Sequence, residues 1–116
     1  MTLVGPHRDE LRFIADEVDL GVFGSRGQQR TAVLALKLAE AEWMRGQLGE
    51  WPVLLLDEVM AELDARRRAY LLGRMQGANQ SLMTSTGLEL FREDFNRTAW
   101  LLRVTAGQIS NLQLEN

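Results

Sequence analysis

The sequence predicts an α/β fold with a partly parallel sheet, flanked by helices and closed by a β-hairpin. Helical and strand-like periodicities alternate along the 116 residues, which is typical of α/β architecture. The most apolar run, Pro52–Leu56, shows no alternation, as expected for a strand buried on both faces of a sheet. Two acids, Asp57 and Glu58, follow this run directly. In open α/β sheets, chemistry is found beyond the carboxyl ends of the strands, so these acids mark the first candidate site.

The first half of the chain predicts one short strand and one long helix. Residues 11–15 alternate between apolar and polar side chains, which indicates a strand. Glycines within residues 21–27 then indicate a loop. Apolar residues recur every three or four positions over about residues 25–45, which predicts a helix with Trp43 in the core.

The second half predicts a further helix, a strand, a helical turn and a closing hairpin. The helix is expected from about Ala65 to Met75, with Asp64 as its N-cap. Its residues expected to be buried are Tyr70, Leu71, Leu72 and Met75. The elements expected after it are a strand at Gln80–Ser85, a helical turn at Leu88–Phe91, and hairpin strands at Trp100–Thr105 and Gln108–Leu112.

Composition excludes several classes of function. Thirteen basic and sixteen acidic residues give a formal net charge of −3, whereas a dedicated nucleic-acid binder usually shows a basic surface. The chain has no cysteine and a single histidine, His7, which excludes disulfides, cysteine-based metal sites and sites that need two histidines. No apolar run approaches the ~18 residues of a membrane span, so we expect a soluble, cytoplasmic chain.

Asp57 and Glu58 at the end of an apolar strand have the pattern of a Walker B strand. In such a strand one carboxylate holds Mg²⁺ and its neighbour orients or deprotonates the attacking water. Adjacent residues of an extended strand point in opposite directions, so the backbone must turn at Glu58 for the pair to divide these roles. The residues alone leave open the alternative that the acids only begin the loop after a buried strand.

Ser25, Arg26, Gly27 and Gln28 precede the long predicted helix. Free N–H groups at a helix N-terminus can bind phosphate, and Gly27 would let an anion approach the backbone. The spacing of Ser25 and Gln28 is equally that of a capping box, and on these residues alone the cap is favoured. No G-x-x-x-x-G-K-[ST] phosphate-binding loop occurs, and Lys37 falls inside the helix.

The order of these motifs resembles the C-terminal half of an ABC-type P-loop ATPase head, with signature motif, Walker B strand, D-loop and switch strand but no Walker A. The amino-acid sequences of four segments resemble those of the RecF family of bacterial recombination mediators. These segments are Gly5–Leu11 (GPHRDEL), Phe23–Arg30 (FGSRGQQR), Leu54–Glu58 (LLLDE) and Glu62–Asp64 (ELD). The resemblance covers nearly the whole chain, so residues 1–116 are expected to form a single segment of such a head.

The resemblance implies roles for three residues on the subunit's own side of the site. Asp57 would coordinate Mg²⁺ and Glu58 would be the catalytic carboxylate. Thr84, within the hydroxyl-rich end of the predicted switch strand, would contact the nucleotide. Many ABC proteins have a histidine at the switch position, which is represented here by Thr84, Ser85 and Thr86.

Four further residues would act across an ATP-dependent dimer. By the same resemblance, Ser25, Gly27 and Gln28 would form the signature loop, which contacts the γ-phosphate of ATP held by the opposite subunit. Asp64 would be the D-loop aspartate. One departure from the ABC pattern is Arg26, which stands where the signature usually has glycine.

For the longer parent, the resemblance implies ATP and Mg²⁺ as cofactors and DNA at gaps or at junctions of single and double strands as a ligand. It also implies three kinds of protein partner: an N-terminal Walker A half, a second subunit, and the proteins RecO and RecR. The isolated chain is expected to have no ATPase activity and to bind no nucleotide.

Two alternatives remain open at this stage. The first is a metal-dependent nuclease or phosphotransferase that uses Asp57, Glu58, Glu62 and Asp64 as a carboxylate cluster. The second is a non-catalytic interaction module.

Overall fold

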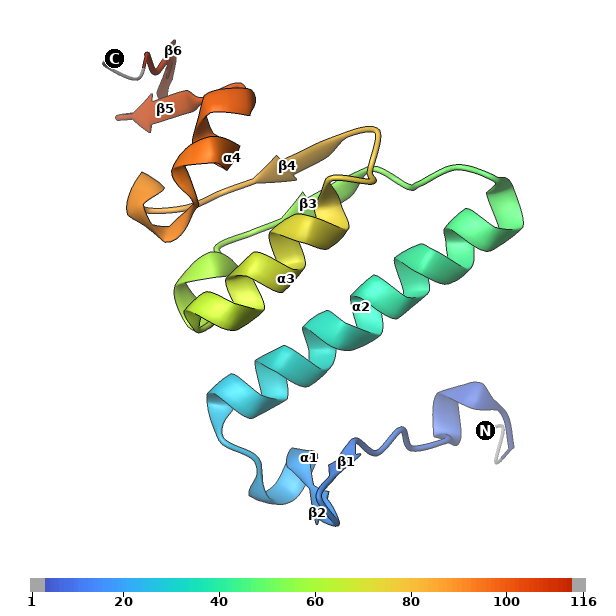
Figure 1. Ribbon diagram of the computed structural model, residues 1–116. Helices are drawn as coiled ribbons and strands as arrows, with labels where there is room; N and C mark the ends of the chain where they lie inside the picture. The colour runs from blue at the N-terminus through green and yellow to red at the C-terminus, as the bar shows by residue number, and fades with distance from the viewer. Residues whose placement is uncertain (1–3, 114–116) are drawn as a thin grey trace.

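A computed structural model describes residues 4–113, so the two ends of the expected segment 1–116 lie outside the described residues. The N-terminal part contains a 3₁₀ turn, η1 (Pro6–Arg8), and a small antiparallel hairpin of β1 (Ile14–Ala15) and β2 (Val18–Asp19) (Figure 1). One helical turn, α1 (Leu20–Phe23), follows this hairpin. The strand expected over residues 11–15 is thus shorter than predicted.

The loop expected over residues 21–27 was wrong in part, because it includes most of α1. Asp19 explains this turn: its carboxylate accepts the Gly21 N–H at 3.0 Å and so caps α1. A single turn is too short to show a helical period, so the glycines dominated the sequence pattern.

The long helix α2 spans Arg26–Leu48. Ser25 caps its start, and Gly49 ends it with a left-handed φ of 78°, which glycine adopts without steric cost. The helix runs past the predicted end at Arg45 because Gly46 remains helical, which costs about 1 kcal/mol but does not break a packed helix.

Two parallel strands, β3 (Leu54–Leu56) and β4 (Ser81–Met83), form the centre of the molecule. The chain passes from β3 through η2 (Met60–Glu62) and α3 (Ala65–Met75) before it returns to β4 (Figure 1). Parallel strands joined by a helical crossover confirm the predicted α/β class and the partly parallel sheet.

The core lies where α3 and η2 meet the strand pair and α2. The buried apolar residues of this cluster are Met60, Leu63, Leu71, Leu72 and Met75. The half-buried residues packed against them are Leu34 and Leu38 of α2, Leu54 and Leu56 of β3, Val59, Met83 of β4, and Leu90, Phe91 and Phe95. The predicted burial of Leu71, Leu72 and Met75 is confirmed.

Three predictions of burial were wrong for the described chain. Trp43 is 65% exposed, Tyr70 is 63% exposed and Leu55 is 72% exposed. Leu55 points away from the core on β3, between two half-buried leucines, so only one face of this strand is covered. The apolar run correctly predicted the strand, but it carried no information on which elements would cover the second face.

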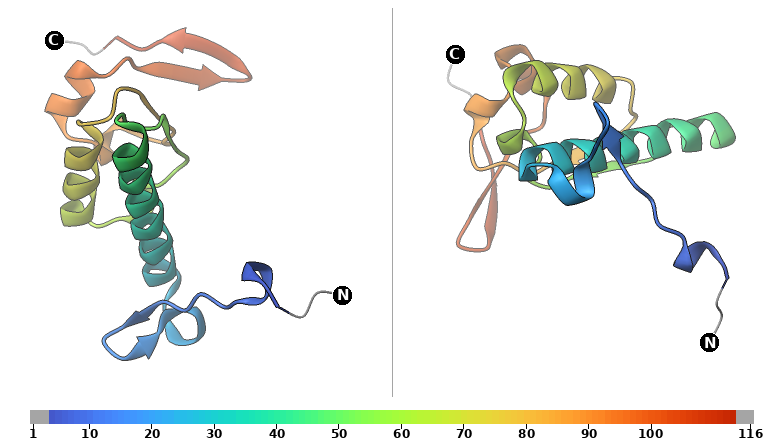
Figure 2. Two further views of the ribbon diagram at one scale, coloured as in Figure 1. Left: turned by 90° about the vertical axis from the view of Figure 1, so that its right-hand side faces the viewer. Right: turned by 90° about the horizontal axis from the view of Figure 1, so that it is seen from below.

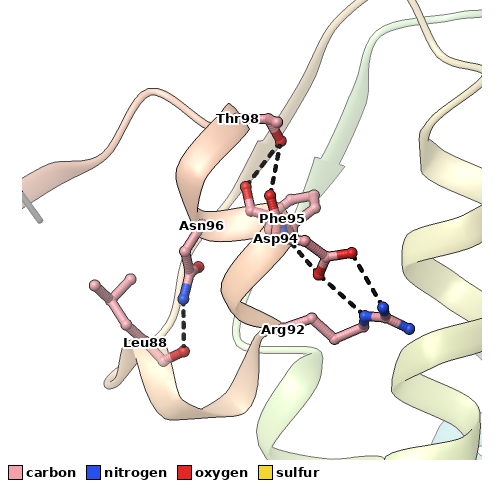
Figure 3. Close-up of polar contacts among 6 residues, drawn as sticks. All are labelled: Leu88, Arg92, Asp94, Phe95, Asn96 and Thr98. Atoms are coloured by element: carbon pink, nitrogen blue, oxygen red, sulfur yellow. Dashed lines mark hydrogen bonds and ion pairs between the residues drawn. The ribbon is translucent and has the colours of Figure 1, made fainter. Parts of the chain in front are cut away.

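The C-terminal part begins with η3 (Leu88–Leu90) and α4 (Glu93–Thr98), and the short α4 was not predicted. Figure 3 shows how the Asn96 side-chain amide donates to the Leu88 carbonyl oxygen at 3.1 Å, which ties α4 to η3. At the start of α4, Arg92 pairs with Asp94.

The closing hairpin pairs β5 (Leu102–Thr105) with β6 (Gln108–Asn111), as predicted. Its turn residues Ala106 and Gly107 have φ of 50° and 78°, the two positive values that a tight two-residue turn requires. The hairpin stands away from the strand pair at one end of the molecule (Figure 2). Within residues 4–113, no helix combines the length and the apolar character that a membrane span needs.

Candidate functional site

The two predicted carboxylates lie at the carboxyl end of β3. Asp57 directly follows the strand and is exposed, whereas Glu58 is half-buried. Glu58 adopts a left-handed backbone with φ of 50°, which is uncommon for a residue other than glycine and costs about 1–3 kcal/mol. The backbone therefore turns at Glu58, as the division of roles between these two acids requires.

The end of β4 brings hydroxyl groups to the same place. The Thr84 N–H donates to the Leu56 carbonyl oxygen at 3.0 Å, which extends the parallel pairing beyond Met83. The Thr84 hydroxyl donates to Asp57 Oδ1 and accepts the Glu58 N–H at 2.9 Å. Residues 27 positions apart in the sequence are thus joined by one hydroxyl group.

The other two hydroxyls of this segment differ from each other. Thr86 Oγ1 lies 3.4 Å from Glu58 Oε1, a weak hydrogen bond to this carboxylate. Ser85 Oγ donates to the Gly87 carbonyl oxygen at 2.9 Å and accepts the Gly87 N–H at 3.3 Å, so it stabilises its own loop. Thr84 and Thr86 therefore face the acids, and Ser85 does not.

The signature segment forms the capping box that its spacing indicates. The Gln28 N–H donates to Ser25 Oγ at 3.2 Å, and the Ser25 N–H donates to Gln28 Oε1 at 2.8 Å. Gly27 lies in the first turn of α2, and a Cβ added there would meet, apart from its chain neighbours and the adjacent helix backbone, no described atom within 4 Å. Packing inside this chain therefore does not explain why glycine stands at this position.

The segment expected to be the D-loop, Glu62–Asp64, lies between α2 and α3. Arg30 of α2 forms an ion pair with Glu62 of η2. The Arg68 side chain of α3 donates from Nε to the Met60 carbonyl oxygen at 2.9 Å, and Met60 itself is fully buried. These contacts fix the path of the chain from the carboxylates to α3.

Asp64 is the N-cap of α3, as predicted. Its Oδ1 accepts the Arg67 N–H at 2.8 Å, and Oδ2 accepts from the Arg67 guanidinium at 2.7 Å. The bond from the Arg67 N–H is the main cause that holds the pKa of Asp64 below its ordinary value. Desolvation, the next largest influence, raises this pKa, and the charge of Arg67 lowers it further. Asp64 is exposed, so the residue remains accessible although its carboxylate is engaged.

The acids expected in the alternative metal-dependent site do not come together. Glu62 pairs with Arg30 and Asp64 with Arg67, while Asp57 and Glu58 face the hydroxyls of β4. In the described part of the chain, no group of three or more acids or histidines could hold a metal ion. The structure thus does not support a nuclease centre made of four carboxylates.

An open groove of about 990 Å³ lies beside the carboxylates. One wall is a stripe of α2 that includes Gln29, Arg30 and Leu34, and the other is formed by residues 52–59. Asp57 and Glu58 line this groove together with Glu62. Residues of α2 from Gln29 onward, the end of β3 and Glu62 therefore share one surface depression, whereas Ser25, Gly27 and Gln28 do not line it.

No family model matches the chain. Individual relatives match it strongly. The DNA replication and repair protein RecF of Latilactobacillus sakei (strain 23K) is 44% identical over 114 residues, which is 98% of this chain. RecF of Chloroflexus aggregans is 52% identical over 109 residues, or 93% of this chain. The chain is similar to RecF over nearly its whole length.

Solved structures of RecF agree with this result. A structure described as the recombination mediator protein RecF-ATP in the RecFOR pathway matches with a TM-score of 0.67 and 35% identity over 97% of this chain. The corresponding RecF-ATPrS structure matches with a TM-score of 0.66. These matches confirm the resemblance to the C-terminal part of RecF and the fold class inferred from it.

The match covers a minor part of each RecF protein. The chain spans 30% of the length of the Latilactobacillus protein and 28% of the chain in the RecF-ATP structure. The similarity therefore describes one segment of a longer RecF architecture.

Proposed function

We propose that this chain is the C-terminal half of a RecF-like ATPase head, which acts in DNA replication and repair. The observation that most strongly supports this proposal is the geometry at the end of β3. There the backbone of Glu58 is left-handed directly after Asp57, and both residues bond the hydroxyl of Thr84, which follows β4. The relatives at 44–52% identity are named DNA replication and repair proteins, and the neighbouring structures are described as RecF with ATP.

The carboxylate oxygens at the end of β3 are suitable ligands for Mg²⁺ of the kind that binds together with a nucleotide. Mg²⁺ prefers oxygen ligands and is usually bound by one or two carboxylates together with substrate phosphates and water. Asp57 offers one exposed carboxylate, and only its Oδ1 takes part in the bond with Thr84. Asp57 would thus hold the ion, and Mg²⁺ with ATP would supply the charge neutralisation that phosphoryl transfer needs.

Glu58 would orient the attacking water and accept its proton. Its backbone turns away from Asp57, so the two carboxylates can address different atoms of one site. Thr86, 3.4 Å from Glu58 Oε1, would limit the directions in which this carboxylate can point.

The N-terminus of α2 would contact the γ-phosphate of ATP that is held by a second subunit. Ser25 and Gln28 close the first turn with the capping box, and the space beside Gly27 is open. Backbone N–H groups and the positive end of a 23-residue helix favour an anion at this position. Asp64 would contribute from the D-loop across the same dimer.

The wider role of the chain follows the same proposal. We call a protein that contains this sequence and has the full length of its RecF relatives a RecF-length protein. Its N-terminal part would supply the Walker A loop, because this sequence contains no G-x-x-x-x-G-K-[ST]. We propose that the complete head dimerises with ATP on DNA at gaps or at junctions of single and double strands, with RecO and RecR as partners in a RecFOR pathway. Cytoplasmic localisation belongs to this proposal.

The direct test of the catalytic assignment uses a RecF-length protein that carries this sequence. Glu58→Gln should keep ATP binding but slow single-turnover hydrolysis about 10²–10⁴-fold, because the base is lost while Asp57 remains. Glu50→Gln is the matched control, since Glu50 is exposed in the loop after α2. Hydrolysis at the wild-type rate in Glu58→Gln would contradict the assignment.

A further inference from the structure

The hydroxyl hydrogen of Thr84 is engaged within the protein. It donates its hydrogen to Asp57 Oδ1 and accepts the Glu58 N–H at 2.9 Å. A threonine hydroxyl has one hydrogen and two acceptor lone pairs. In this arrangement Thr84 has no hydrogen left to donate to a phosphate oxygen, and one lone pair remains unused. A direct contact between Thr84 and the nucleotide stays a prediction, while the observed bonds point to a role within the protein.

We propose that Thr84 is a positioning residue, which holds both the Asp57 carboxylate and the backbone turn at Glu58. This inference rests on the proposed function, since it gives the hydroxyl end of β4 a specific part in the ATPase site. One side chain would set the direction of the metal-binding oxygen and the conformation from which the catalytic carboxylate projects.

The need for such a group comes from the backbone of Glu58. A φ of 50° disfavours any residue with a Cβ, so the conformation persists only where surrounding bonds hold it. The bond from the Glu58 N–H to Thr84 is such a restraint, and it spans two strand ends that are 26 positions apart in the sequence. Loss of this bond would let the residue relax toward ordinary φ values and move its carboxylate.

Thr84 is well placed to act as a fixed point. Its own N–H donates to the Leu56 carbonyl oxygen at 3.0 Å, which anchors its backbone to β3 immediately before Asp57. Threonine is branched at Cβ, so its χ1 angle has few alternatives once the backbone is fixed. The same strand pairing that forms the sheet therefore also aims the hydroxyl.

Thr86 makes a separate and weaker contact. Its hydroxyl lies 3.4 Å from Glu58 Oε1 and touches only the carboxylate, whereas Thr84 bonds the backbone. The two threonines thus restrain different parts of Glu58. Thr84 holds its backbone conformation, and Thr86 restricts the orientation of its carboxylate.

The first measurement is hydrogen–deuterium exchange of the Glu58 amide in a RecF-length protein without nucleotide, with residue-level fragmentation in a mass spectrometer. Thr84→Val should speed exchange of this amide about 3–10-fold, the range expected for loss of one hydrogen bond. Thr84→Ser keeps the hydroxyl and should exchange like the wild type. Thr105→Val, on the exposed hairpin strand β5, controls for the substitution itself. Unchanged Glu58 exchange in Thr84→Val would overturn the inference.

The second measurement separates positioning from direct phosphate contact in the same proteins. Thr84→Val should lower kcat about 10–100-fold and raise the Mg²⁺ concentration for half-maximal rate, because a small misplacement of reacting groups is costly. ATP affinity should stay within about twofold, since a typical hydrogen bond to the nucleotide is not removed. Thr84→Ser should restore the wild-type values.

Two outcomes would overturn the inference even if Thr84 proved important. Weaker ATP binding by Thr84→Val with unchanged Glu58 exchange would indicate a direct contact with the nucleotide. Faster exchange with an unaltered kcat and Mg²⁺ requirement would leave Thr84 with a purely structural part. Absence of ATP hydrolysis by the wild-type protein would instead contradict the proposed function, and the exchange of the Glu58 amide would still decide whether Thr84 holds the turn.

Discussion

At the scale of single residues, the site depends on where side chains are already engaged. Asp57, Glu58 and Glu62 all line the open groove, but Glu62 is paired with Arg30. Asp64 illustrates a residue with two roles, because the carboxylate that would act across a dimer also caps α3. The local role is testable without nucleotide or partner.

The capping role of Asp64 predicts a specific pH dependence. Because the folded state lowers the pKa of Asp64 below its ordinary value, the stabilising effect of its charge is complete above the unfolded pKa of about 3.9 and is lost as the pH falls through the folded value. Asp64→Ala should lower the Tm by about 5 °C at pH 7. This difference from the wild type should shrink steadily below about pH 4.

Asp64→Asn is the matched control for this prediction. Asparagine caps helices about as well as aspartate but does not titrate. Thermal melts of the three proteins between pH 7 and pH 3 provide the measurement. A difference between wild type and Asp64→Ala that persists unchanged at pH 3 would show that the charge of Asp64 is irrelevant to α3.

At the scale of elements, the central helix α3 separates buried from exposed residues within one turn. Leu71 is 1% exposed and belongs to the core cluster, whereas the adjacent Tyr70 is 63% exposed beside Arg74. The stability of the segment should therefore depend on one side of α3. Of the three consecutive arginines at its start, Arg66 and Arg67 are exposed, and Arg68 is half-buried and donates to the Met60 carbonyl oxygen.

Leu71→Ala should destabilise the folded chain by about 2–5 kcal/mol, because it removes a fully packed side chain and leaves a cavity. Tyr70→Ala, one position earlier in α3, should change the free energy of unfolding by about 0.5 kcal/mol or less. Urea melts followed by circular dichroism would measure both. Equal losses in the two variants would show that the face of α3 is assigned incorrectly.

Elements with a clear local signal could be predicted from the sequence. Ser25 and Gln28 mark the start of α2, and the turn residues Ala106 and Gly107 mark the hairpin, because these signals act over a few residues. The helix α4 has six residues and too little periodicity for detection. The pattern of Pro52–Leu56 indicated a strand, but burial of its second face depends on elements far away in the chain.

For the candidate site, too, some features could be predicted from the sequence and others could not. The acids Asp57 and Glu58 and the hydroxyls of residues 84–86 could be identified as candidates, because they follow predicted strands. The bond network between them could not, since it depends on the register of β3 against β4 and on the positive φ of Glu58. Sequence order gives no measure of either quantity.

At the scale of the whole molecule, the chain is extended for its length. Its radius of gyration is 17.5 Å, against about 13 Å for a compact domain of this size. The strand pair has an unpaired outer edge at β4 within the described residues, and apolar side chains on β3, β4 and the hairpin are exposed. In a RecF-length protein we expect further elements to cover these surfaces.

The isolated chain should therefore self-associate or be marginally stable. An exposed apolar strand edge invites pairing with another chain, here around Leu82–Thr84 at the end of β4. Light scattering over a concentration series, with thermal melts alongside, should show association that Leu82→Lys weakens. A monodisperse monomer with a high Tm that does not depend on concentration would show that the segment is a complete domain.

The central claim is that this segment supplies a signature loop for a second subunit as well as its own catalytic acids. The most direct test is sedimentation of a RecF-length protein with ATP, in a Glu58→Gln background that slows hydrolysis. Ser25→Arg should abolish ATP-dependent dimers while one-subunit ATP affinity stays nearly intact, because the bulky cation fills the space for the partner's phosphate. Ser25→Thr keeps a capping hydroxyl and should still dimerise. Normal ATP-dependent dimers of Ser25→Arg would contradict the claim and leave Ser25 as a helix cap.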